Sequence, residues 1–191
     1  PTLLPVLHDN VARLARCGYA NVAVQAVALS DHEGVGQLFV PDAFAENDGL
    51  ASLETPDAPG RSVPVPLKRL DDVMNTKSFI RLTKVDVEGH EASVFAGADA
   101  LLRRGTLETI LYEEHEGAHS RATQLLQQHG YAIFKLVRTA TGVRLVSPDD
   151  ATFDVPYAPV NFVATRNVAY LQTCLTPPGW TIYQLNARSA P

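Results

Sequence analysis

Cysteine is scarce in this sequence, and long apolar runs are missing. Only two of the 191 residues are cysteine, Cys17 and Cys174, and they form neither a CxxC nor a Cys/His spacing. A disulfide framework or a zinc site is therefore not predicted, no metal ligands are assigned, and a reducing cytoplasm fits best. No apolar run approaches the roughly 18 residues that a membrane helix needs, so we expect no membrane partner.

The sequence also lacks the short motifs that mark several common enzyme classes. It contains no GxGxxG, no Walker lysine loop, no GxSxG and no HExxH. Predictions of a classical dinucleotide site, a P-loop, a serine hydrolase or a zinc protease therefore lose their central feature.

Charge of neither sign dominates. The chain has 16 Lys and Arg against 21 Asp and Glu, a net charge of -5 that disfavours nucleic acid as a partner. With 46% hydrophobic and 19% charged residues it is typical of one globular α/β domain, and nothing indicates its oligomeric state. We expect the domain to cover residues 1–168 and a tail of uncertain structure to cover 169–191. The chain begins at Pro1 rather than Met, as a fragment or a processed chain does.

Hydrophobic periodicity predicts an alternation of helices and strands. The predicted elements are a helix packed on one face over Leu3–Cys17, a buried strand over Asn21–Leu29, a short strand over Gln37–Val40, a proline-rich connection over Pro41–Pro66, a short helix over Leu70–Met74, a strand over Ile80–Val87, a helix over His90–Arg104, a strand over Thr109–His115, a helix over His119–His129, and strands over Tyr131–Val137, Val143–Val146 and Asn161–Thr165. From Tyr170 onward the periodicity is weak, and we expect mostly irregular structure.

Such an alternation indicates a parallel sheet with helices on both faces. Ligands of these sheets bind beyond the carboxyl ends of the strands, so polar residues at strand ends are the candidates for a site. The long proline-rich connection is a second candidate, because loops of that length are usually functional.

The densest cluster of polar residues follows the strand at Ile80–Val87. Asp86, Glu88 and Glu91 place three carboxylates beside the imidazole of His90. Like charges this close raise one another's pKa unless they face water, a cation or a substrate, so the crowding favours a site. The alternative is that Glu88 and Glu91 only complement the positive end of the following helix. The alternation also places Lys84 on the same side as Asp86, where it can pair with a carboxylate.

A second cluster ends the next strand, with Glu113, Glu114 and His115. Glu113 and His115 share one face of the strand, and histidine titrates near neutral pH, so His115 is a candidate general base toward a hydroxyl. The alternative is a polar strand end at the rim of the sheet. In a parallel sheet the two clusters lie next to each other.

Several blocks of the sequence resemble FkbM-type methyltransferases. The stretch Lys84–Glu91 (KVDVEGHE) is similar to the family's K-I/V-D-V/I-E-G-x-E block, and Phe95, Gly97 and Ala98 follow it as they do in the family. Four further blocks stand in the family's order: Ala28–Asp31 (ALSD) with Gly34, Gly49–Leu53 (GLASL), Val65–Val73 (VPLKRLDDV) and Ile110–Glu113 (ILYE) with His115.

This resemblance implies an α/β fold: a Rossmann-like methyltransferase three-layer sandwich with a mostly parallel sheet that here lacks the first strands. It implies S-adenosylmethionine as cofactor. Asn10, aligned with the family's L-x-x-N, Ala28 and Leu29, which line the adenine, and Asp86, near the methionine end, are then the cofactor-binding residues. The family's glycine-rich loop is expected upstream of Pro1, so the chain alone is expected to be inactive.

The function implied is O-methylation of a hydroxyl on a sugar or small natural product. Asp86, Glu88, Glu113 and His115 are the candidate catalytic residues, with Asp86 positioning the acceptor or the cofactor ammonium and one of the others acting as base. Two alternatives stay open: a Rossmann-like binding module without chemistry, and a sugar-nucleotide transferase that uses Asp86 and Glu88 around a divalent metal.

Overall fold

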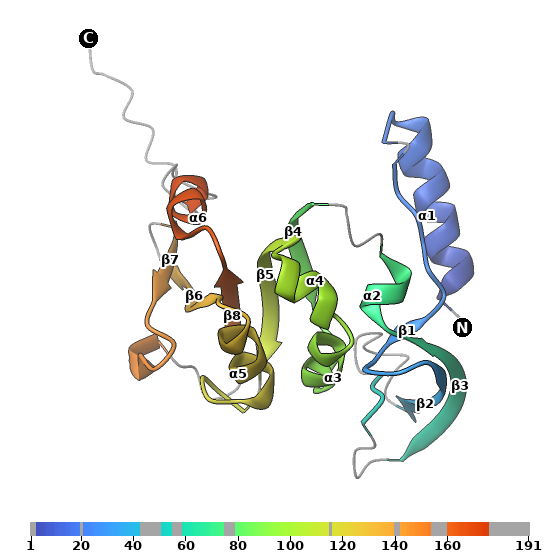
Figure 1. Ribbon diagram of the computed structural model, residues 1–191. Coiled ribbons are helices and arrows are strands. Elements are labelled where there is room, and N and C mark those ends of the chain that lie inside the picture. The colour runs from blue at the N-terminus through green and yellow to red at the C-terminus, as the bar shows by residue number, and fades with distance from the viewer. Residues whose placement is uncertain are drawn as a thin grey trace.

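The computed structural model describes residues 3–19, 21–42, 51–54, 59–74, 79–114, 116–139, 142–153 and 160–175. They form two β-sheets with helices around them, a three-stranded sheet on the right of Figure 1 and a five-stranded sheet nearer its centre. The helices are α1 (Leu4–Arg16), α2 (Leu70–Val73), α3 (Glu91–Ala96), α4 (Asp99–Arg104), α5 (Arg121–Gln128) and α6 (Val168–Leu175). The strands are β1 (Ala28–Leu29), β2 (Gly34–Pro41), β3 (Gly60–Lys68), β4 (Ile80–Val85), β5 (Leu107–Glu114), β6 (Ala132–Thr139), β7 (Gly142–Val146) and β8 (Val160–Thr165).

The five-stranded sheet has the order β4-β5-β8-β6-β7 and is mixed. Only β4 and β5 pair in parallel, whereas β8 runs antiparallel to both β5 and β6, and β7 runs antiparallel to β6. The prediction of an α/β fold is confirmed, and the prediction of a mostly parallel sheet is wrong. Parallel neighbours need a crossover, which α3 and α4 supply between β4 and β5. β7 and β8 both run antiparallel to β6, one on each of its edges, and β8 thereby separates β6 from β5.

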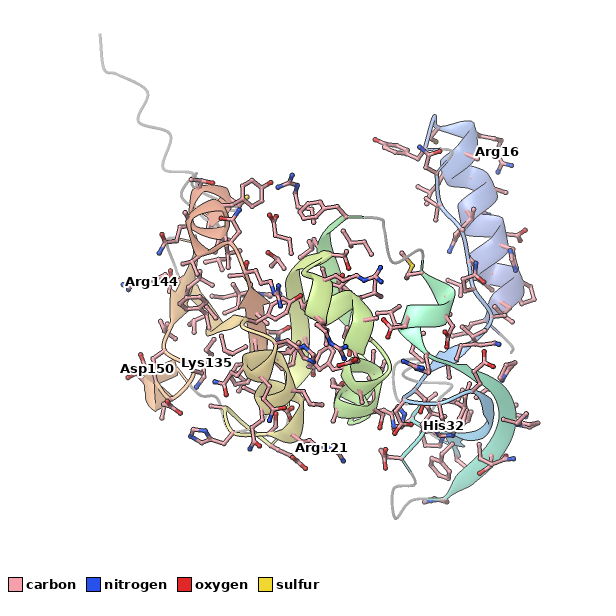
Figure 2. All side chains as sticks on the ribbon, viewed as in Figure 1. Arg16, His32, Arg121, Lys135, Arg144 and Asp150 are labelled. Carbon is pink, nitrogen blue, oxygen red and sulfur yellow. The ribbon has the colours of Figure 1, made fainter. Side chains whose placement is uncertain are left out.

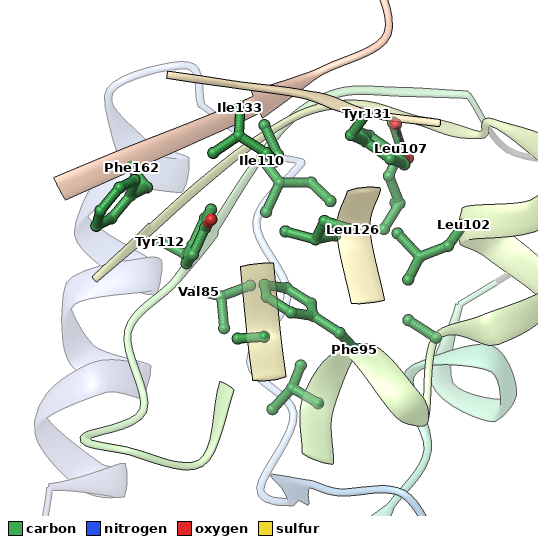
Figure 3. Close-up of a cluster of buried hydrophobic side chains, with 14 of the residues drawn as sticks. Val85, Phe95, Leu102, Leu107, Ile110, Tyr112, Leu126, Tyr131, Ile133 and Phe162 are labelled. Carbon is green, nitrogen blue, oxygen red and sulfur yellow. Dashed lines mark hydrogen bonds between the residues drawn. The ribbon is translucent and has the colours of Figure 1, made fainter. Parts of the chain in front are cut away.

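The core lies between the five-stranded sheet and the helices α3, α4 and α5 (Figure 3). The Tyr112 ring is its centre, meeting the Phe95 ring edge-on at 5.6 Å and stacking on the Phe162 ring at 5.7 Å. Tyr112 and Phe162 are partners in neighbouring strands, so their side chains point to the same face. On the other face, the β4 residue Leu82 is 64% exposed.

The pKa values of two tyrosines in this core predict how the folded state loses stability at alkaline pH. Burial raises the pKa of the Tyr112 and Tyr131 hydroxyls from the ordinary value of 10 to about 12. Each therefore stabilises the folded state below pH 10, and this stabilisation, about 2–3 kcal/mol per residue, is lost as the pH rises from 10 through 12. Urea unfolding at a series of pH values measures this loss. The free energy of unfolding should fall less steeply with pH in Tyr112→Phe than in the wild type. Tyr19 is exposed, so in the control Tyr19→Phe this slope should equal that of the wild type. Equal slopes in Tyr112→Phe and Tyr19→Phe would contradict the assignment of the alkaline loss to the buried tyrosine.

The predicted helix over His90–Arg104 is interrupted at Gly97. A Cβ atom on Gly97 would lie 2.0 Å from the carbonyl oxygen of Ser30, so only glycine allows these two backbones to approach so closely. The Asp71 carboxylate then accepts hydrogen bonds from the amides of Ala100 and Leu101, at 2.9 and 3.0 Å, and begins α4 as a separate helix. The predicted apolar stripe is nevertheless confirmed, because its members are buried: Val94, Phe95, Ala98, Leu101 and Leu102.

The amino-terminal elements are less buried than predicted. The helix over Leu3–Cys17 is confirmed as α1, yet none of its residues is buried, and its apolar residue Val6 is 55% exposed. Of the predicted strand Asn21–Leu29, only Ala28 and Leu29 pair, in parallel with β3. An apolar strand needs neighbours on its edges and faces, and in the described part of the chain β3 is the single neighbour of β1.

The proline-rich connection Pro41–Pro66 is partly a strand, contrary to prediction. Its last residues belong to β3, which pairs with the whole of β2, from Gly34↔Leu67 to Pro41↔Gly60. Pro64 and Pro66 are two residues apart, so both lack an N–H on the same edge of β3, and β1 reaches that edge only at Leu67 and Lys68. The residues between β2 and β3 that the structure describes, 51–54, bridge to β2 through Phe39 and Ser52.

The expected irregular tail begins with a helix. The side-chain oxygen of Asn167 accepts a hydrogen bond from the Tyr170 amide at 3.0 Å and starts α6, and the Arg81 guanidinium lies 4.6 Å from the Tyr170 ring. Residues 176–191 lie outside the described residues. Among the helices of the described ranges, none has the length and apolarity to cross a membrane.

Charged side chains are spread over the surface of both sheets (Figure 2). A buried exception is Lys135 on β6, whose ammonium donates to the Asp150 carbonyl oxygen at 2.7 Å. At the three-stranded sheet His32 lies 2.6 Å from the Asp31 carboxylate and, through this hydrogen bond, lowers the pKa of that carboxyl. Asp31 lies two residues beyond the end of β1 and borders the candidate site.

Candidate functional site

The candidate site begins at the turn between β4 and α3. Glu88 has φ +51° and Gly89 has φ +95°, so two consecutive residues are left-handed. Glycine adopts this conformation freely, whereas for a glutamate it costs about 1–2 kcal/mol. Among the described residues, Glu88 is the single non-glycine residue with positive φ. Strain of this kind persists where function or the surrounding structure requires it.

Glu91 has a structural role at this turn. Its carboxylate is buried in the first turn of α3 and accepts a hydrogen bond from the Val87 amide at 3.2 Å. This agrees with the alternative in which glutamates complement the start of the helix. Glu88 differs, since no hydrogen bond or ion pair of its carboxylate occurs within the described residues. Within the cluster Glu91 therefore holds the turn, whereas the Glu88 carboxylate is left for another partner.

Asp86 is held by a lysine from its own strand. The Lys84 ammonium lies 2.6 Å from the Asp86 carboxylate, which confirms the predicted pairing. This hydrogen bond raises the pKa of Lys84, and the negative charge of Glu113 adds to the rise. Asp86 keeps 38% of its side chain exposed, so its second carboxylate oxygen stays accessible to solvent or to a ligand.

Glu113 lies on the strand next to the one that Asp86 follows. Val85, the last residue of β4, pairs in parallel with Tyr112, and Asp86 and Glu113 are the residues that follow these two along the chain. On the other side of β5, Glu113 pairs with Asn161 of β8. Directly paired residues point to the same face of a sheet. Glu113 and Asn161 therefore point to the same face, and Asp86 follows the end of the neighbouring strand β4; we call these three residues the strand-end row.

A second cluster joins this turn to the three-stranded sheet. Ser30, which is 1% exposed, has its Oγ 3.2 Å from His90 Nε2 and 3.3 Å from the Asp31 carboxylate. His90 Nδ1 lies 2.9 Å from the Glu54 carboxylate. In addition, Ser52 Oγ donates to the Glu88 carbonyl oxygen at 2.8 Å and accepts from the Glu54 amide at 3.0 Å. We call Ser30, Ser52, Glu54 and His90 the cross-link cluster.

The structure places the predicted site residues in three regions. Asp86 and Glu113 lie together in the strand-end row, and Glu88 lies in the turn two residues beyond Asp86. Ala28 and Leu29 are half-buried in β1, whereas Asn10 is exposed on α1. His115 falls outside the described residues, and no metal-binding group of three or more His, Cys, Asp or Glu side chains occurs within them.

Sequence reasoning missed three residues of the site. Asn161 stands on a strand that periodicity alone does not place beside β5, so no local signal marks it. Ser52 and Glu54 lie in the middle of the proline-rich connection, which was predicted as a candidate only as a whole, and their contacts with the turn after β4 show their role. Glu114, which belongs to the second predicted cluster, is buried, and its carboxylate accepts a hydrogen bond from the Glu116 amide at 2.8 Å.

Comparisons with known proteins give a family match and a weaker structural likeness. A family model described as the methyltransferase FkbM domain matches residues 6–133. A solved structure, the methyltransferase FkbM from Methylobacillus flagellatus KT, is 14% identical with a TM-score of 0.47. The match covers 84% of this chain and 33% of that protein, so the chain spans about a third of its length. No curated protein matches the chain.

Proposed function

The chain belongs to the FkbM methyltransferase family, and on this premise we propose that it serves S-adenosylmethionine-dependent methyl transfer to a hydroxyl group. The acceptor class that we propose is a sugar or a small natural product. The observation that carries this proposal is the strand-end row, in which Asp86 and Glu113 stand at the carboxyl ends of two parallel strands. Ligands of α/β sheets bind at such ends.

The side chains present suit both the cofactor and a hydroxyl acceptor. Asp86 has an accessible carboxylate oxygen, which is the type of group that binds an ammonium or a hydroxyl. Ala28 and Leu29 offer a half-buried apolar edge that suits a purine. Asn10, Ala28, Leu29 and Asp86 are therefore the residues that we propose to contact the cofactor, and the methyltransferase three-layer sandwich is part of the same proposal.

The protein's task in such a reaction is alignment and proton removal. When bound, S-adenosylmethionine would supply a methyl group on a sulfonium: the acceptor oxygen would bond to the methyl carbon as the carbon–sulfur bond breaks and S-adenosylhomocysteine leaves. Asp86, which is held in place by its bond to Lys84, orients the acceptor or the cofactor ammonium. Glu88, Glu113 or His115 accepts the hydroxyl proton. Asn161, beside Glu113, is placed to hydrogen-bond a neighbouring hydroxyl of the acceptor.

A transfer assay tests the proposal in the protein as its gene encodes it. The protein is incubated with S-adenosylmethionine carrying a labelled methyl group and a panel of sugars and polyhydroxylated small molecules. We expect label in at least one acceptor and formation of S-adenosylhomocysteine. Binding of S-adenosylmethionine without transfer to any acceptor would favour a binding module instead. Binding of manganese with a sugar nucleotide, in the absence of S-adenosylmethionine binding, would favour a metal-dependent transferase.

The strained turn gives a separate prediction about Glu88. Glu88→Gly removes the left-handed strain while glycine adds freedom to the unfolded chain, so we expect stability between unchanged and about 1 kcal/mol higher. Transfer should nevertheless fall, because the carboxylate is lost. Urea unfolding and the transfer assay measure the two effects, and Glu88→Gln is the control that keeps the strain. A Glu88→Gly protein destabilised by more than 1 kcal/mol would show that the carboxylate is needed for folding.

A further inference from the structure

The cross-link cluster connects three segments that are far apart in the sequence. Ser30 follows β1, Glu54 belongs to the segment between β2 and β3, and His90 ends the turn after β4. His90 makes both long-range side-chain contacts, to Ser30 at 3.2 Å and to Glu54 at 2.9 Å. Only 14% of its side chain is exposed, whereas 62% of the Glu54 side chain is exposed.

The donors and acceptors of this cluster fit together. A carboxylate only accepts hydrogen bonds, so the contact with Glu54 assigns a hydrogen to Nδ1 of His90. The Ser30 hydroxyl carries one hydrogen, which it donates either to Nε2 of His90, at 3.2 Å, or to the Asp31 carboxylate, at 3.3 Å. Each ring nitrogen thus has its own partner on a different segment, an arrangement that fixes the plane of the ring.

A nucleophilic role for Ser30 does not fit the structure, although the order serine, histidine, carboxylate is that of a hydrolase triad. Ser30 is 1% exposed, and its backbone is packed against Gly97 and bonded to Lys68 through its amide at 2.9 Å. A substrate carbonyl has no access to its hydroxyl. The contacts are therefore better explained as a fixed link than as a second catalytic centre.

This link connects the two sides of the proposed site. Ser30 directly follows Ala28 and Leu29, the proposed adenine contacts. His90 directly follows the turn that carries Asp86 and Glu88. The Ser52 hydroxyl fixes the same turn from the other side, through the Glu88 carbonyl oxygen. A shift of His90 thus changes the position of the acidic turn relative to β1.

We propose that His90 is a positioning residue for methyl transfer, which holds the acidic turn after β4 in register with the end of β1 through Ser30 and Glu54. This inference rests on the proposed function and adds a residue to it. Each side of the site keeps its own binding groups when the link is cut. Loss of His90 therefore lowers kcat, because a misaligned acceptor and methyl carbon react slowly, and leaves the KM for each substrate nearly unchanged.

Three variants separate the two contacts of His90. Asn places a donor near the position of Nδ1 and can keep the bond to Glu54, whereas Gln reaches the position of Nε2 and can keep the bond to Ser30. His90→Ala removes both. We expect kcat to fall by roughly 10–100-fold in His90→Ala, with partial rescue in His90→Asn and His90→Gln. The control is His119→Ala, since the His119 side chain is 86% exposed and, within the described residues, pairs with the exposed Asp149.

Hydrogen exchange provides a readout that does not depend on activity. In His90→Ala we expect faster amide exchange in residues 51–54 and 86–91, with unchanged exchange in α5 and β6. The proposed role of His90 would be overturned if the wild type turns over and His90→Ala is fully active, or if exchange is unchanged in both segments. Either result would leave the proposed function standing. A wild-type protein that transfers no methyl group would instead contradict the proposed function and, with it, the catalytic consequence of the link.

Discussion

Asp86→Ala is expected to lower methyl transfer by roughly 100-fold or more while leaving the protein folded. The loss follows from the place of Asp86 at the carboxyl end of β4, next to the strand that carries Glu113 and bonded to Lys84. The fold should survive, because the Lys84–Asp86 pair is largely exposed and such pairs contribute at most about 1 kcal/mol. Initial rates with labelled S-adenosylmethionine and urea unfolding of the same preparation measure the two quantities.

The control for Asp86→Ala is Asp149→Ala. Asp149 is 63% exposed and pairs with His119, away from the strand-end row, so its loss should change neither rate nor stability appreciably. Turnover close to that of the wild type in Asp86→Ala would remove Asp86 from the site. A large loss of stability in Asp86→Ala would assign the residue to the fold instead.

Gly97→Ala is expected to destabilise the protein by about 3 kcal/mol. The added Cβ would lie 2.0 Å from the Ser30 carbonyl oxygen and 3.4 Å from the Arg69 Cα atom. Both neighbours are backbone, so relief requires α3 and α4 to move away from the end of β1. Urea unfolding measures the change in free energy, and a shift in the midpoint without a change in slope would show that stability alone is affected.

The matched control for this substitution is Gly34→Ala. A Cβ on Gly34 would meet only the exposed His32 ring, at 3.7 Å, so we expect a change within about 0.5 kcal/mol. A Gly97→Ala protein as stable as the wild type would contradict the close approach of Ser30 to the helices. Because Ser30 also contacts His90, Gly97→Ala should further increase amide exchange in residues 86–91.

Local patterns in the sequence predict much of this molecule. The stretch Arg81–Glu91 combines an alternating strand with acids at its end, and both β4 and the Lys84–Asp86 pair follow from it. The apolar stripe from Val94 to Leu102 and the stop at Gly105, with φ +68°, follow from helical spacing and from glycine's freedom at a helix end. In each case the cause lies within one element or between neighbours in the sequence.

Contacts between distant segments are what the sequence does not reveal. The position of β8 between β5 and β6 brings Asn161 to Glu113, and it depends on a return of the chain that periodicity does not encode. The interruption at Gly97 depends on Ser30 and on the carboxylate of Asp71, both far away along the chain. For the same reason the contacts of His90 with Ser30 and Glu54 appear only in the folded structure.

Titration of S-adenosylmethionine into the protein as its gene encodes it, followed by calorimetry, tests the proposed function most directly. We predict saturable binding with one site per chain that is displaced by S-adenosylhomocysteine. Absence of saturable binding, or binding that S-adenosylhomocysteine does not displace, would contradict the assignment of Asp86 and its neighbours to a methyl-transfer site.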